Sequence, residues 1–174
     1  MALSLDGTTG VSLVQDGVLT DANMPAGSVL QVVSTTKTDT ETKTNATYED
    51  ISGLSLSITP TSASSKILVL VTAMINPGDS RGSQWKVVRD TTDIAVNTIS
   101  NPSTGGTYTN INTSNSGTWV GTSVTHLDSP ATTSEVTYKI QSRISSTGTY
   151  GINRRATAND YGGVSAITLM EISA

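Results

Sequence analysis

The sequence contains no cysteine, and this absence excludes whole classes of site. Without thiols the 174-residue chain has no disulfide bond, no thiolate metal ligand and no cysteine nucleophile. A single histidine, His126, also excludes a metal site built from several histidines. The stability of the fold therefore does not depend on the redox state of its surroundings, and we expect no cofactor.

Charge is scarce as well, because only 14% of the residues are charged and the net charge is −4. The basic residues are scattered, with Arg154 and Arg155 as the one adjacent pair. Binding to nucleic acid needs clustered Lys and Arg, so we expect none. No apolar run approaches the roughly 20 residues that cross a bilayer, so we expect no membrane insertion. The start, Met1 to Asp6, has no basic region or long apolar stretch, and we expect no signal peptide.

Phenylalanine is absent and aromatic residues total 4%, so we expect a core built from Val, Ile, Leu and Met. In their place the chain has 30 Thr and 24 Ser. Threonine is β-branched and fits the half-buried surface of a pleated sheet. The composition therefore indicates an all-β protein with hydroxyl-rich solvent faces. A small aliphatic core of this kind often gains stability by oligomerisation.

Alternation of apolar and polar residues predicts strands along most of the chain, and no window shows helical periodicity. The clearest case is 135–144, where Val136, Tyr138, Ile140 and Ile144 point one way, so one face is core and the other is solvated. The expected strands are 54–58, 66–75, 84–89, 93–99, 108–113, 118–127, 135–144, 149–153 and 164–172. Short strands separated by turn signals predict an antiparallel β-sandwich, jelly-roll-like, over residues 28–174.

The segment 66–75 is apolar on both faces, which predicts a central strand covered on both sides. A buried helix is the competing interpretation, but the Ile and Val content favours a strand.

Residues 1–27 differ from the rest and predict an extended N-terminal arm or small hairpin. Asp16-Gly17 suits the type I′ turn of a two-residue hairpin, which is marginal on its own. The apolar residues of this segment need a partner, either their own domain or another protein. We expect them to bind a partner surface: Leu3, Leu5, Val11, Leu13, Val14, Val18 and Leu19.

The sequence allows three kinds of chemistry in principle, and we expect none of them. His126 and Asp128 could join a serine in a triad, but such triples arise by chance in a Ser-rich chain, and no Gly-x-Ser-x-Gly motif is present. A glycosidase carboxylate pair is possible in principle, and so is calcium at Asp16 and Asp21 or at Asp160. We therefore predict no catalytic residue, no metal and no enzymatic activity.

The large rings and the histidine are the candidates for an interface. Trp and Tyr are enriched at protein interfaces and can also stack on sugars. Core packing, a subunit interface and a glycan contact all remain open for them. The candidates for a subunit or ligand interface are Trp85, Tyr108, Trp119 and His126.

Several stretches resemble small structural and fibre-type proteins of tailed phages of cyanobacteria and other aquatic bacteria. They are GLSLSITPTSASSKILVLV at 53–71, HLDSPATTS at 126–134 with TYKI at 137–140, and ITLMEI at 167–172. The stretches LDGTTGV at 5–11 and GSVLQVV at 27–33 resemble the N-terminal parts of such fibres. The motifs are turns and strands, so the resemblance implies a fold and a virion setting but no active-site residue.

Tail fibres of this kind are usually longer and carry a dedicated anchoring region, whereas about 27 residues precede the β-domain here. We therefore expect a compact virion protein that decorates or cements the capsid, with the arm as its anchor. Its partners would be the major capsid protein or another virion protein and, in a homo-oligomer, further copies of itself, with a trimer favoured. The alternative is a tail- or head-fibre tip that binds host surface glycans. In either case the protein would be made in the bacterial cytoplasm and act on the virion.

Overall fold

The described residues form two antiparallel β-sheets packed face to face, with no helix among them. The structure is a computed structural model that describes residues 24–76, 82–96, 108–111 (backbone only), 120–144, 148–156, 158 and 162–174. The predicted all-β antiparallel sandwich is therefore confirmed. The strands are β1 Val29–Lys37, β2 Glu41–Lys43, β3 Glu49–Ile58, β4 Lys66–Asn76, β5 Ser83–Arg89, β6 Thr92–Ile94, β7 Tyr108–Ile111, β8 Val120–Asp128, β9 Val136–Ile144, β10 Tyr150–Ile152 and β11 Ser165–Ile172.

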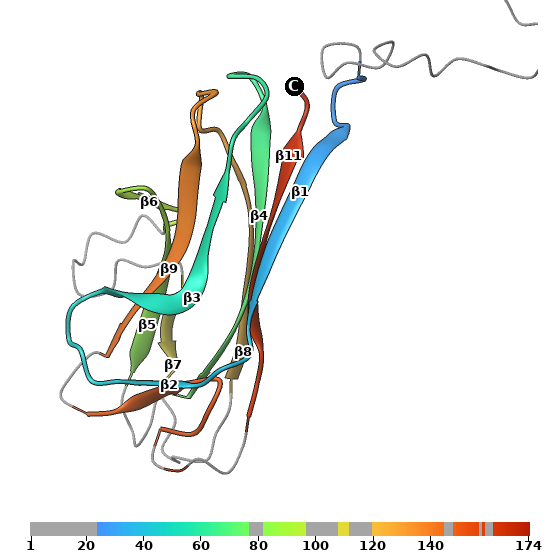
Figure 1. Ribbon diagram of the computed structural model, residues 1–174. Helices are drawn as coiled ribbons and strands as arrows, with labels where there is room; N and C mark the ends of the chain where they lie inside the picture. Colours follow the sequence, from blue (N-terminus) through green and yellow to red (C-terminus); the bar gives the residue numbers. More distant parts are fainter. Residues whose placement is uncertain are drawn as a thin grey trace, which may run out of the picture.

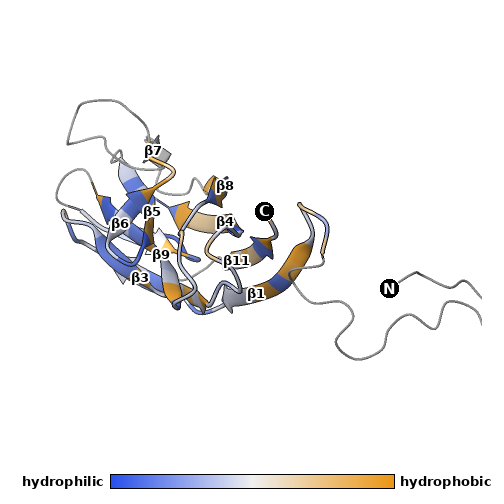
Figure 2. Ribbon diagram, turned by 90° about the horizontal axis from the view of Figure 1, so that it is seen from above, coloured by the Kyte–Doolittle hydropathy of each residue, from blue (hydrophilic) through white to orange (hydrophobic). Residues whose placement is uncertain are grey.

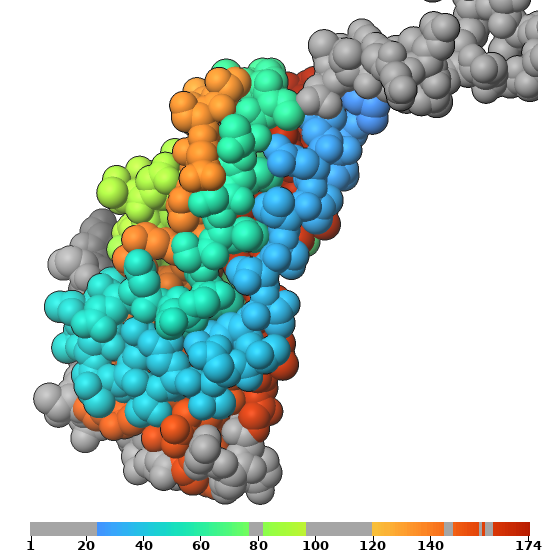
Figure 3. Space-filling model, in the orientation of Figure 1, coloured from blue at the N-terminus to red at the C-terminus, as the bar shows by residue number. Residues whose placement is uncertain are grey.

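One layer, sheet A, contains β1, β11, β4 and β8, with the short β10 and β2 at one end. The other layer, sheet B, contains β3, β9 and β5, with β6 and β7 both paired to β5. Figure 1 shows the two layers side by side, with β1, β11 and β4 in one and β3, β9 and β5 in the other. The segment after β1, which includes β2, covers one side of the sandwich in the space-filling view (Figure 3).

The jelly roll is a finer prediction, and the strand order supports it. The short strand β10 continues the position of β11 beside β4, and β2 continues that of β1. With these pairs merged, and β6 merged with β7, each sheet has four strand positions. The chain then changes sheet at every connection except the one after β5, as in an eight-stranded jelly roll. The jelly-roll interpretation remains a prediction on this basis.

The core lies between the two sheets and is mainly aliphatic, as expected from the composition. In β9 the predicted alternation is confirmed, because Val136, Tyr138, Ile140 and Ile144 are all buried. The expectation for methionine is wrong for the described residues, since none of Met24, Met74 and Met170 is among the buried core residues. Three rings also belong to the core, and Trp85, Tyr138 and Tyr150 are its largest fully buried side chains.

The segment 66–75 forms the strand β4, as predicted, but the cover expected on both sides is given on only one side by the residues that the structure describes. Its inward residues, from Ile67 to Ile75, are buried, whereas its outward residues are half-buried or exposed. The same alternation runs along β11. Sheet A therefore covers the core with one face, and the described part of the chain leaves the side chains of the other face half-buried or exposed.

The chain enters the sandwich beside its own C-terminus. The Gly27 amide donates to the Ser173 carbonyl oxygen at 2.9 Å, and the Ser173 hydroxyl donates to the Pro25 carbonyl oxygen at 2.7 Å. Residues 25–28, of which 25–27 belong to the predicted arm, are thus fastened to the end of β11. The apolar arm residues between Leu3 and Leu19 lie outside the described part of the chain.

Candidate functional site

The outward side chains of sheet A form an uncharged surface, which we call the sheet A outer face. The strand registers place Val32 opposite Met170, Met170 opposite Leu68, and Leu68 opposite Leu127. Because directly opposed residues in an antiparallel pair share a face, these four side chains form one apolar row across all four long strands. We call this set the outer row.

The outer row is open to solvent at both ends. Val32 at one end is 53% exposed and Leu127 at the other is 54% exposed, although both are large aliphatic side chains. Val29, which is 49% exposed, pairs with Ile172 and extends the apolar surface along β1 and β11. Three of the five large hydrophobic residues that are exposed among the described residues therefore belong to this one surface.

The positions next to the outer row carry hydroxyls rather than charges. One step along the strands, Ser34, Thr168, Leu70 and Thr125 form the next row, and the Ser34 and Thr168 hydroxyl oxygens lie 2.8 Å apart. Within the outward positions of β1, β11, β4 and β8, the one charged residue is Lys66, at the end of β4. Its ammonium group donates to the Ser129 hydroxyl at 2.8 Å.

The outward face of sheet B has the opposite character. The Lys139 ammonium lies 3.1 Å from the Asp50 carboxylate, and that of Lys86 lies 2.7 Å from Asp93. The Lys86 ammonium also lies 4.6 Å from the centre of the Tyr48 ring, a cation–π contact. In Figure 2 the ribbon of β3 is largely hydrophilic, whereas β1, β4 and β8 carry hydrophobic stretches. The sandwich therefore has one charged, solvated face and one uncharged face.

A partly buried ion pair joins the two sheets near the end of β8. The Arg89 guanidinium donates to Asp128 Oδ2 at 2.6 Å, and the Tyr138 hydroxyl donates to the same oxygen at 2.8 Å. Burial raises the pKa of Tyr138 and the adjacent carboxylate raises it further, so the phenol stays protonated as a donor. Asp128 therefore links the two sheets through Arg89 and Tyr138. Neither of these contacts orients its carboxylate toward a serine or His126, as a catalytic triad would require.

The residues that the sequence marked as interface candidates do not gather at one place. Trp85 is 0% exposed and packs in the core, which is one of the three alternatives that the sequence left open for the large rings. His126 is half-buried on β8, opposite Val69. The side chain of Tyr108 and all of Trp119 lie outside the described residues, as do Asp16, Asp21 and Asp160.

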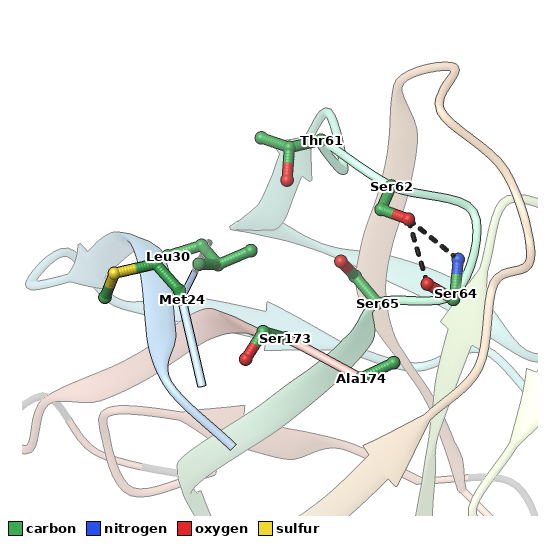
Figure 4. A pocket seen from close by; sticks show the side chains of 8 residues that line it. All are labelled: Met24, Leu30, Thr61, Ser62, Ser64, Ser65, Ser173 and Ala174. Atoms are coloured by element: carbon green, nitrogen blue, oxygen red, sulfur yellow. Dashed lines mark hydrogen bonds between the residues drawn. The ribbon is translucent and has the colours of Figure 1, made fainter. Parts of the chain in front are cut away.

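A shallow cavity of about 390 Å³ opens where the chain enters and ends (Figure 4). Small hydroxyl side chains predominate in its lining, and no aromatic ring is among them. Behind it, the buried Glu171 accepts from the Thr61 amide at 2.7 Å and from Gln31 Nε2 at 2.6 Å. Burial opposes ionisation of Glu171, but these bonds outweigh it and hold its pKa below the usual value. The lining residues are Met24, Leu30, Thr61, Ser62, Ser64, Ser65, Ser173 and Ala174.

Sequence reasoning missed the sheet A outer face, although its signal was present. A strand that is apolar on both faces needs cover on both faces, and the described residues cover only one face of β4. Among the described residues, no group of three or more acidic or histidine side chains is placed to hold a metal ion. The same residues include no helix with the length and hydropathy to cross a membrane.

Comparison with known proteins gives no family for this chain. No protein-family model matches the sequence, and no curated protein matches it.

Proposed function

We propose that this protein is a non-enzymatic structural subunit of a phage virion, which decorates or cements the capsid and is anchored through its N-terminal segment. The observation that carries the proposal is the division of the surface into a charged face and an uncharged one. Contiguous apolar surface on a small domain marks a site of association with other proteins. The sheet A outer face has this character and extends across four strands.

The position of the N-terminal segment supports the anchoring role. Residues 25–28 are hydrogen-bonded to Ser173, so the segment before them starts from a fixed point at one end of the sandwich. It carries seven leucine and valine residues and only three charged side chains, all of them acidic. The resemblance to phage structural proteins in 53–71, 126–140 and 167–172, which contribute to β3, β4, β8, β9 and β11, points to the same setting.

A decorating subunit works by mass action. A protein that binds the assembled shell, and not its separated subunits, stabilises the shell by its binding free energy. When several N-terminal segments of one oligomer bind the shell at the same time, the overall affinity is far higher than that of a single segment.

The test is binding of the protein to purified empty capsids, followed by co-sedimentation. Full-length protein should bind at a fixed copy number per shell, and a variant that lacks residues 1–23 should lose binding. This truncation keeps Pro25 and Gly27, so the contacts with Ser173 remain and the sandwich serves as its own folding control. Absence of binding by both forms would contradict the proposal and favour the receptor-binding fibre tip, for which a glycan array is the corresponding assay.

A further inference from the structure

We propose that the sheet A outer face binds the same face of a second copy of this chain. This inference deepens the proposed structural function, because it assigns the face to contacts between copies and leaves the N-terminal segment free for the shell. The argument rests on pattern, charge and size.

The first step is the pattern of β4 and its neighbour β11. The residues Leu68, Leu70 and Met74 point away from the core that buries Ile67, Val69 and Val71. An outward face exposed to water is normally polar in an antiparallel sheet. Here the outward positions of β4 and β11 are apolar at Leu68, Leu70, Met74 and Met170 and uncharged at Thr72 and Thr168, so the fold provides a largely apolar outer layer that the described residues do not cover.

The second step is charge, which favours a copy of the same face as the occupant. The chain carries a net charge of −4, and most of its surfaces would bring carboxylates together if two copies met. The outward positions of β1, β11, β4 and β8 hold no carboxylate, because Glu171 and Asp128 point inward. Two such faces can meet with no opposed acidic groups, and the single Lys66 lies at the end of the strand, where it can remain solvated.

The third step is size and shape. Four strands spaced about 4.8 Å apart, each about 30 Å long, give a face on the order of 600 Å² in projection. Side-chain relief raises the accessible area toward the roughly 800 Å² that each partner contributes to a standard interface. A two-fold contact uses the same surface on both copies, so the outer row of one copy can cover the outer row of the other.

The experiment is sedimentation velocity on the full chain as its concentration rises, with two matched double variants. V32D/L127D places carboxylates at both ends of the outer row, at positions that are about half exposed in the single chain. S55D/T92D adds the same charge to exposed positions of sheet B, on β3 and β6. We expect the wild type and S55D/T92D to associate, and V32D/L127D to associate at least about a hundredfold more weakly, because it buries opposed carboxylates.

Three results would overturn the inference. The wild type could remain monomeric throughout, or V32D/L127D could associate as strongly as S55D/T92D. A monomeric wild type that begins to associate when residues 1–23 are removed would show that its own N-terminal segment covers the face. Capsid binding is scored separately, so a monomer that still binds shells would contradict this inference and leave the proposed function standing.

Discussion

Replacing Gly151 by alanine should destabilise the fold by about 3 kcal/mol or prevent folding altogether, because the added methyl group has no space. A Cβ at this position would overlap the Arg154 carbonyl oxygen and would lie 3.0 Å from the carbonyl carbon of Arg155. Both are backbone atoms, so no side-chain rotation can relieve the overlap.

The crowding at Gly151 follows from the turn that succeeds β10. Asn153 adopts a left-handed conformation with φ of 56°, which folds residues 154–156 back over the strand. The Ala156 amide then donates to Asn76 Oδ1 at 3.0 Å, and this bond holds the turn against β4. The turn cannot move away from a new methyl group without losing that buried bond.

The measurement is the free energy of unfolding, by denaturant or heat, of the G151A variant and of the matched control variant G162A. Gly162 lies in the bridge with Arg154, and a Cβ there would meet nothing within 4 Å, so G162A should stay within about 0.5 kcal/mol of the wild type. Equal stability of the two variants would show that the turn does not pack over β10 as described.

Replacing Trp85 by alanine should lower the free energy of unfolding by about 3–5 kcal/mol, since it removes the largest fully buried side chain. Trp85 lies on β5 in the middle of sheet B, opposite Ser142 of β9, and its ring fills the space between the sheets. Truncation leaves a cavity that a stiff sandwich cannot close.

The measurement is equilibrium unfolding by urea of Trp85→Ala and of Trp85→Phe. The phenylalanine variant keeps most of the packed volume, so it should lose clearly less stability than the alanine variant. A loss below about 1 kcal/mol for Trp85→Ala would mean that the ring is exposed, as in the interface alternative that the sequence left open.

The fold class was predictable because β9 and β4 carry clear patterns. In β9 apolar and polar residues alternate strictly, and one face of the strand is buried while the other is solvated. The two-residue period alone therefore predicts which residues are buried. The sequence pattern predicted no strand at the positions of β1 and β2, and each of these two omissions has a physical reason. β1 contains a register irregularity between Val29 and Gln31 that breaks its period, and β2 has only three residues.

The environment of the buried charged residues was beyond prediction because distant parts of the chain contribute to it. The Lys37 side chain is fully buried: its ammonium lies 3.0 Å from the nearby Asp39, but the Lys37 carbonyl accepts from the distant Asn153 Nδ2 at 2.8 Å. The Glu171 carboxylate accepts from Thr61 and Gln31, which both lie more than a hundred positions away. A single sequence does not show that residues more than a hundred positions apart will meet.

The sheet A outer face was only half predictable. Its signal is the two-sided apolar pattern of 66–75, which indicated cover on both faces but did not show that the described residues cover only one of them. The outer row becomes visible only when the registers of four strands are combined, because Val32, Leu68, Leu127 and Met170 are scattered through the sequence.

Oxidative footprinting of Met170 tests most directly the central claim that the sheet A outer face is a contact surface. Met170 lies in the middle of the outer row, whereas Tyr48 lies on the charged face of sheet B and serves as the internal control. Between about 1 µM and about 100 µM protein, we expect oxidation of Met170 to slow several-fold while that of Tyr48 stays constant, because the outer row becomes covered as copies associate. Oxidation of Met170 at the same rate across that range would contradict the claim and show that the face remains open to solvent.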